Sequence, residues 1–148
     1  MKRVFTLGIA IVLSVATLGF SGDGLPHFNA APPKKGQKLP PILAKQHRWG
    51  PDFQHRHQVR AYELAEQVSS ELHQMPCFCY CDRIGHDSLR SCFVDLHGAR
   101  CPVCMQETFY TYQQKKMGKT AKQIRAGIEK GEWQSIELNE AAQRSMKP

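Results

Sequence analysis

Residues 75–104 read MPCFCYCDRIGHDSLRSCFVDLHGARCPVC, and every cysteine of the chain lies in this stretch. The six cysteines are Cys77, Cys79, Cys81, Cys92, Cys101 and Cys104. Disulfide frameworks of exported domains usually spread their bridges across the domain, whereas metal and redox sites gather thiols into one or two loops. The spacing therefore predicts one spatial cluster of thiols.

The CxCxC run at residues 77–81 favours metal ligation over disulfides among its own members. Two cysteines that are two residues apart close only a strained ring when they are bridged. If the run curls into a loop, its sulfurs can converge on one ion at about 2.3 Å each, and Cys92 and the CPVC pair can supply further ligands. Structural disulfides that join the run to the later cysteines remain the alternative.

Two histidines, His86 and His97, lie between the cysteines in the sequence. Imidazole can complete a soft-metal coordination shell or pair with a thiolate. We therefore count both as candidate metal ligands. The HRH motif formed by His55 and His57 lies outside the cluster, and we interpret it as a solvated polar turn.

The CPVC pair is also suited to redox chemistry. Because Pro102 is tolerated in the first turn of a helix, we expect Cys101 at a helix N-terminus, where free N–H groups and the dipole favour the thiolate. Cys101 would then attack and Cys104 would resolve the intermediate, with Cys79 as the second candidate nucleophile. No βαβ pattern surrounds the pair, which argues against a thioredoxin-like fold.

Helical periodicity occurs on both sides of the cysteines. The expected helices cover residues 57–74, 102–117 and 120–130, and the pattern of residues 87–94 is also compatible with a short helix. Pro76 ends the helix at 57–74, and Gly118 ends the helix at 102–117. Thr120 opens the last helix with a capping box, and Gly131 terminates it. We predict a mainly α fold class, a small single domain of two or three helices around an irregular cysteine-rich loop.

Composition divides the rest of the chain. Residues 1–24 begin MKR and continue without a charge through most of their length, which is typical of a signal peptide or an uncleaved N-terminal membrane anchor. Residues 25–41 are rich in proline and lysine and predict a linker. The cysteine-cluster helical domain is expected at 42–133 and a flexible tail at 134–148. An exported protein, periplasmic or extracytoplasmic and open to membrane association, follows from this organisation.

The formal net charge is +7, but the lysines are dispersed and are not interleaved with aromatic residues along one face. This pattern gives no reason to expect nucleic acid as a partner. The partners that the cysteines predict are a metal ion or a redox partner protein.

Four stretches together carry a family resemblance: MPCFCYC, GHDSLRSCFV, HGARCPVC and GKTAKQIRAGIEKGEW. They resemble exported bacterial proteins with a PCYCGC or CYCXC motif, some of which carry selenocysteine. The resemblance covers about residues 40–133. The site residues that it implicates are Cys77, Cys79, Cys81, His86, Cys92, His97, Cys101 and Cys104.

The chain departs from the motif of that family at two positions. Phe78 replaces the usual tyrosine, and Tyr80 stands where glycine is common. We therefore expect a bulkier CxCxC loop that is less free to curl around an ion. The resemblance implies no particular activity.

Three functions are compatible with these observations. The leading hypothesis is a cell-envelope protein that binds a soft metal, Cu or Zn, through clustered cysteine and histidine side chains. The second is an extracytoplasmic thiol–disulfide redox protein, and the third is an interaction module stapled by disulfides. The sequence has no recognisable Ser/His/Asp arrangement and no phosphate-binding glycine loop, so a binding protein is favoured over an enzyme.

Overall fold

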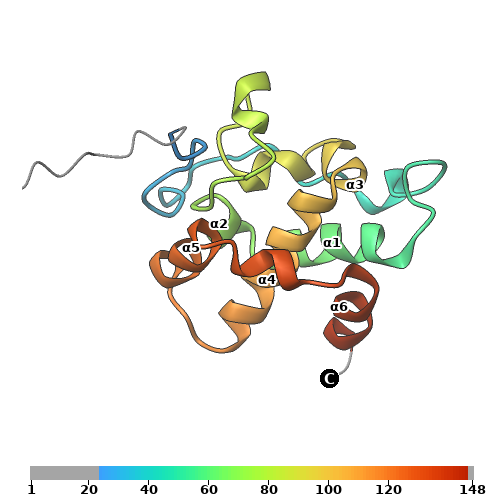
Figure 1. Ribbon diagram of the computed structural model, residues 1–148. Coiled ribbons are helices and arrows are strands. Elements are labelled where there is room, and N and C mark those ends of the chain that lie inside the picture. The colour runs from blue at the N-terminus through green and yellow to red at the C-terminus, as the bar shows by residue number, and fades with distance from the viewer. Residues whose placement is uncertain (1–23, 147–148) are drawn as a thin grey trace, which may run out of the picture.

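The computed structural model describes residues 24–146, and all regular structure within this range is helical (Figure 1). The elements are η1 (Lys45–His47), α1 (Arg56–Gln67), α2 (Ser69–Leu72), η2 (Cys81–Ile84), η3 (Leu89–Phe93), α3 (His97–Arg100), α4 (Pro102–Lys116), α5 (Ala121–Glu129), η4 (Glu132–Ser135) and α6 (Leu138–Ser145). The mainly α prediction is confirmed, but the expected number of helices is too small.

The expected signal or anchor at residues 1–24 lies outside the described residues, apart from Gly24. Within the described part, no helix combines the length and the apolar character that a bilayer crossing requires.

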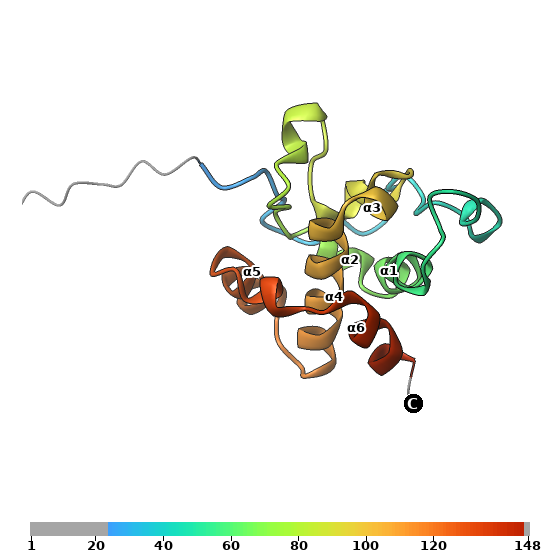
Figure 2. The same ribbon diagram turned by 45° about the vertical axis from the view of Figure 1, so that its right-hand side comes forward.

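The longest helix, α4, runs through the middle of the molecule, with α1, α3, α5 and α6 packed against it (Figures 1 and 2). It begins at Pro102 as predicted. An N–H group in the first turn has no partner within the helix, so proline, which lacks this group, is tolerated there. Gly118 follows its end with a φ of 81°, a left-handed conformation that glycine adopts at little cost. Pro102 itself is exposed, but Cys104 and Met105, which follow it in α4, are buried.

The helix that we expected over residues 57–74 is divided into α1 and α2. Val68 leaves helical geometry with φ −115° and ψ 28°, and α2 begins at the next residue. Ser69 Oγ accepts a hydrogen bond of 2.8 Å from Arg90 Nε, a long-range contact that the helical pattern does not encode. After the break the chain reaches Met75, which is fully buried and accepts a hydrogen bond from the Leu89 N–H.

Tyr62 of α1 links the core to the segment that carries His97. Its ring lies edge-on to Phe53 and Phe93, with centroid separations of 5.2 and 5.0 Å. Its hydroxyl donates to the Asp95 carbonyl at 2.5 Å and accepts from the Ala99 N–H at 3.1 Å. These two hydrogen bonds fix the backbone on both sides of His97, so the core determines where this imidazole lies.

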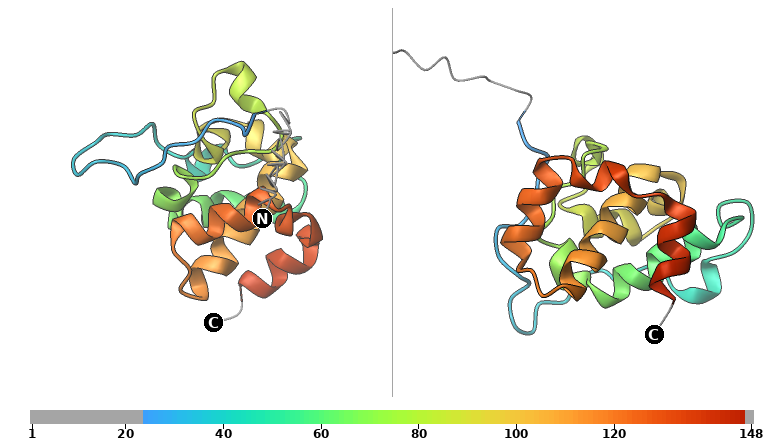
Figure 3. Two further views of the ribbon diagram at one scale, coloured as in Figure 1. Left: turned by 60° about the vertical axis from the view of Figure 1, so that its left-hand side comes forward. Right: turned by 60° about the horizontal axis from the view of Figure 1, so that its bottom comes forward.

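The predicted flexible tail at 134–148 is wrong for most of its length. Residues 138–145 form α6, which lies beside α1 (Figure 3), and Ala141 and Ala142 are buried there. Ile136 is also buried, and its carbonyl accepts a hydrogen bond of 3.0 Å from Gln106. This helix is only eight residues long and its buried side chains are alanines, which indicate a packed face less plainly than large apolar residues do.

Residues 25–41 have irregular backbone, as a linker would, but part of this segment contacts the domain. The His27 N–H donates to Asp82, and the Asn29 side chain donates to the His73 carbonyl at 3.1 Å. The Arg125 guanidinium lies 4.5 Å from the centroid of the Phe28 ring. The packed structure therefore begins before residue 42, where we expected it to start.

Candidate metal centre

The eight candidate ligands come from separate elements that meet at the N-terminal end of α4. Cys77 and Cys79 precede η2, which projects from the body of the molecule (Figure 1), and Cys81 is its first residue. Cys92 lies in η3, and Cys101 and Cys104 lie at the start of α4. His86 follows η2, and His97 opens α3. All six cysteines are free thiols.

The donor atoms of these residues are in direct contact. The sulfur–sulfur distances are 3.3 Å for Cys77–Cys79, 3.5 Å for Cys77–Cys104, 3.7 Å for Cys79–Cys104 and 3.3 Å for Cys81–Cys92. Cys79 Sγ lies 3.6 Å from His97 Nε2, and Cys92 Sγ lies 3.5 Å from His86 Nδ1. The prediction of one spatial cluster is confirmed.

Four groups of donors have all their ligand atoms within 4.8 Å of one another, and each group could hold a metal ion. The groups are Cys79/His97/Cys101/Cys104, Cys81/His86/Cys92/His97, Cys77/Cys79/Cys81 and Cys77/Cys92/Cys104. Every residue that the sequence proposed as a ligand occurs in at least one group. The groups overlap, so the donors form a continuous network.

The network has a buried side and an accessible side. Cys77, Cys81, Cys92 and Cys104 are buried, whereas Cys79, Cys101, His86 and His97 are half-buried. His97 also lines a surface cavity of about 410 Å³ together with Asp95, Leu96 and Arg100. A small ion therefore has access to the network from the side of α3.

Hydrogen bonds among the sulfurs shift the thiol pKa values in opposite directions. The pKa of Cys79 is lowered, mainly by its hydrogen bond with Cys101, and the pKa of Cys92 is lowered to about 3, mainly by its hydrogen bond with Cys104. Hydrogen bonding with Cys104 raises the pKa of Cys77. The pKa of His86 is raised, mainly because its ring is hydrogen-bonded to the Cys92 sulfur.

The first choice of redox nucleophile is not supported by these pKa shifts. Cys101 lies at the N-cap of α4 as expected, and its hydrogen bond with Cys104 lowers its pKa. The hydrogen bond to Cys79 and burial act in the opposite direction, and the net pKa of Cys101 is raised. Cys79, the second candidate, has the accessible thiol with a lowered pKa.

Glu107 is also part of the site, although no motif in the sequence marks it. It lies one turn after Cys104 on α4 and is completely buried. Its Oε1 accepts a hydrogen bond of 2.8 Å from the Phe78 N–H, while Oε2 has no hydrogen-bond partner. Burial raises the pKa of this carboxyl well above its usual range, which favours the neutral acid. Glu107 thus anchors the CxCxC loop between Cys77 and Cys79.

We expect Glu107→Ala to weaken zinc binding about 10–100-fold, the usual cost of losing a group that orients metal ligands. Glu107→Gln is the matched control, because its amide oxygen can still accept from Phe78 and it resembles the neutral acid in shape. Competition titration with a chromophoric chelator measures both affinities. Equal affinities for the alanine and glutamine variants would show that the Phe78 hydrogen bond has no such role.

Comparison with known proteins places these residues in a family. A family model described as a protein of unknown function with PCYCGC motif matches residues 50–135. The chain belongs to this family. The matched range contains all eight donors and Glu107, and it ends before α6. No curated protein and no solved structure matches the chain.

The backbone conformation at position 80 explains why the PCYCGC motif has a glycine there. Tyr80 occupies its position and has a φ of 57°, in the left-handed region that glycine adopts most easily. This conformation curls the run, and the sulfurs of Cys77, Cys79 and Cys81 lie within 4.8 Å of one another. The expectation that a bulky residue here would keep the loop from curling is therefore wrong. The Arg83 guanidinium lies 5.0 Å from the centroid of the Tyr80 ring.

We expect Tyr80→Gly to be about 1 kcal/mol more stable than Tyr80→Ala, because an L-residue with a Cβ pays about 1–2 kcal/mol in the left-handed region. Both variants lose the same ring contacts with Arg83, so their difference isolates the backbone. Urea unfolding under reducing conditions gives the two free energies. If alanine proves as stable as glycine, the left-handed conformation at this position is not strained.

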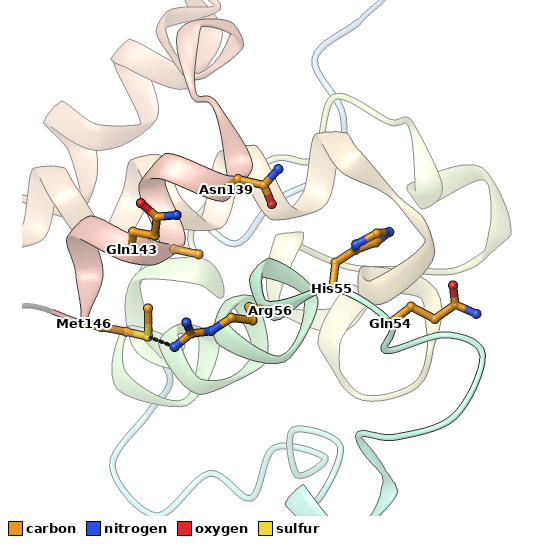
Figure 4. A pocket seen from close by; sticks show the side chains of 7 residues that line it. Gln54, His55, Arg56, Asn139, Gln143 and Met146 are labelled. Carbon is orange, nitrogen blue, oxygen red and sulfur yellow. Dashed lines mark hydrogen bonds between the residues drawn. The ribbon is translucent and has the colours of Figure 1, made fainter.

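A separate cavity of about 410 Å³ lies between the start of α1 and α6 (Figure 4). Its lining consists of Gln54, His55, Arg56, Asn139, Ala142, Gln143 and Met146. His57 is hydrogen-bonded to Asn139 at 2.8 Å, and its ring stacks on that of His55. None of the cysteines lines this cavity, and the HRH motif forms an ordered polar contact between α1 and α6.

Proposed function

We propose that this protein binds a soft metal, Zn(II) or Cu(I), in the cell envelope through its clustered cysteine and histidine side chains. The observation that carries the proposal is the set of sulfur–sulfur contacts between 3.3 and 3.7 Å. Two thiolates on one tetrahedral zinc ion, each about 2.3 Å from the metal, are about 3.8 Å apart. The thiols thus already have nearly the spacing of ligands that share an ion.

The chemistry of the donors supports the same function. Thiolate sulfur and imidazole nitrogen select zinc and copper over the hard cations Mg²⁺ and Ca²⁺, which prefer oxygen ligands. Among residues 24–146, Glu107 is the only buried acidic side chain, and its raised pKa favours the neutral acid. The apolar stretch near the N-terminus is the reason to place this binding outside the cytoplasm.

A disulfide-stapled module fits the contacts less well. A framework of three bridges pairs each sulfur with one partner. Here Cys77 Sγ contacts both Cys79 and Cys104, and the sulfurs of Cys79 and Cys104 also contact each other. Such shared contacts are suited to ligands around an ion.

Elemental analysis and a thiol count test the proposal on the full chain purified without oxygen. We expect zinc or copper in stoichiometric amount, and six reactive thiols after the metal is removed under denaturing conditions. Six blocked cysteines without metal would contradict metal binding and would support the disulfide-stapled module.

The redox alternative is favoured by one observation, the lowered pKa and partial exposure of Cys79. Its sulfur contacts Cys77 at 3.3 Å and Cys104 at 3.7 Å, so two thiols could resolve a mixed disulfide on Cys79. In this function the partner is a protein or small molecule with a disulfide bond. Site-resolved alkylation of the metal-free, reduced chain distinguishes it, because Cys79 would then react much faster than the other five thiols.

A further inference from the structure

The network holds more donors than a single ion can use. A tetrahedral zinc ion binds four ligands, whereas eight side chains contribute to the four groups of the cluster. The cluster therefore has enough ligands for two ions. This inference rests on the proposed function of metal binding.

One complete set of four donors lies on the accessible side. The ligand atoms of Cys79, His97, Cys101 and Cys104 are all within 4.8 Å of one another. Within this set, Cys79 Sγ is 3.6 Å from His97 Nε2 and 3.7 Å from Cys104 Sγ. Three thiolates and one imidazole are a common ligand set for tetrahedral zinc.

A second set remains when His97 is assigned to the first. Cys81, His86 and Cys92 belong to a group whose fourth member is His97. Cys77 can take that fourth place, because its sulfur shares one group with Cys81 and another with Cys92. The Cys81 and Cys92 sulfurs are 3.3 Å apart, and Cys92 contacts His86. The second set also has three thiolates and one imidazole.

The two sets adjoin at Cys77. Its sulfur is 3.3 Å from Cys79 and 3.5 Å from Cys104, both of which belong to the first set. We propose that the cluster is a binuclear centre that holds two zinc ions side by side, one in each set, with the buried Cys77 thiolate at their junction. No donor is left over, and no ion needs a ligand from outside the chain.

The two ions differ in accessibility. Three of the four donors in the first set are half-buried, whereas three of the four in the second set are buried. His97, in the first set, also lines the surface cavity next to α3. The first ion therefore exchanges with a chelator faster than the second.

Native mass spectrometry of the full-length reduced chain, loaded with Zn(II) and freed of excess metal, counts the ions directly. The binuclear centre predicts two zinc ions per chain and a two-phase release to a chelator, with one ion in each phase. One zinc ion per chain would overturn the binuclear centre and leave the proposed function intact. Absence of bound zinc would overturn the binuclear zinc centre and would also contradict zinc binding as the proposed function.

Two variants test which set of ligands releases its ion in the fast phase and which in the slow phase. Cys101→Ser removes a half-buried donor of the first set alone, so it should abolish the fast phase and keep the slowly released ion. His57→Ala changes a histidine that bonds to Asn139 and belongs to no donor group, and it should keep both ions. Loss of the slow ion alone in Cys101→Ser would contradict the assignment.

Discussion

Replacing Cys81 and Cys104 together by serine is expected to destabilise the zinc-loaded domain by several kcal/mol. Both side chains are buried, at 4% and 0% exposure, and they come from different elements, η2 and α4. In the proposed centre Cys104 binds one ion and Cys81 the other, and the two sets adjoin at Cys77, so the double variant removes a ligand from each ion. A domain of this size depends strongly on such a metal cross-link between its elements. Chemical denaturation with saturating zinc measures the loss.

The same measurement with a chelator present is the control for this double variant. A buried serine hydroxyl has its own cost, which persists without metal, whereas the cost of lost ligation appears only with zinc. We expect the larger part of the destabilisation to require zinc. An unchanged free energy of unfolding in the variant would show that the cysteines are not a structural cross-link.

Each bound zinc ion is expected to stabilise the wild-type domain by about 4 kcal/mol when the free zinc concentration is about 1,000 times the dissociation constant of its site. For a chain of this size such a gain raises the Tm by roughly 15 °C. Differential scanning calorimetry of the reduced protein, with zinc and with excess chelator, gives the two transition temperatures. The Cys81→Ser/Cys104→Ser variant should show little of this shift, and identical transitions in the wild type would mean that zinc does not bind the folded state preferentially.

Where local chemistry decides the structure, the sequence was sufficient to predict it. Pro102 and Gly118 mark the limits of α4, and the capping box of Thr120 is present at the start of α5. The ligand candidates were also identifiable, because six cysteines within one short stretch of chain lie close together in space in a small domain. These signals act within a few residues and do not depend on the rest of the fold.

Features that depend on distant contacts were not predictable from the sequence. The break at Val68 is accompanied by a hydrogen bond between Ser69 and Arg90, which are 21 residues apart. In the sequence, Glu107 has the character of a surface residue of a helix. In the fold it is buried, and it accepts a hydrogen bond from the Phe78 N–H. The sulfurs of Cys77, Cys79 and Cys81 likewise come together in a run that contains the left-handed Tyr80, a conformation that the sequence pattern does not indicate.

Binding of a soft metal by the cluster is expected to depend on pH in a distinctive way. Hydrogen bonding with Cys104 raises the pKa of Cys77, and Cys81 and Cys104 also have raised pKa values because of their hydrogen bonds with Cys77 and Cys101, respectively. A raised pKa favours the protonated thiol, so an ion must displace protons in order to bind. Affinity should therefore rise as the pH rises and fall as the pH falls.

The most direct test is a titration of the reduced, metal-free chain with Zn(II) or Cu(I) at several pH values, in which bound metal and released protons are counted together. We expect stoichiometric uptake, proton release at neutral pH and an affinity that increases with pH at a slope equal to the number of protons released. Absence of uptake, together with a single fast-reacting thiol in site-resolved alkylation of the same sample, would contradict metal binding and support the redox alternative.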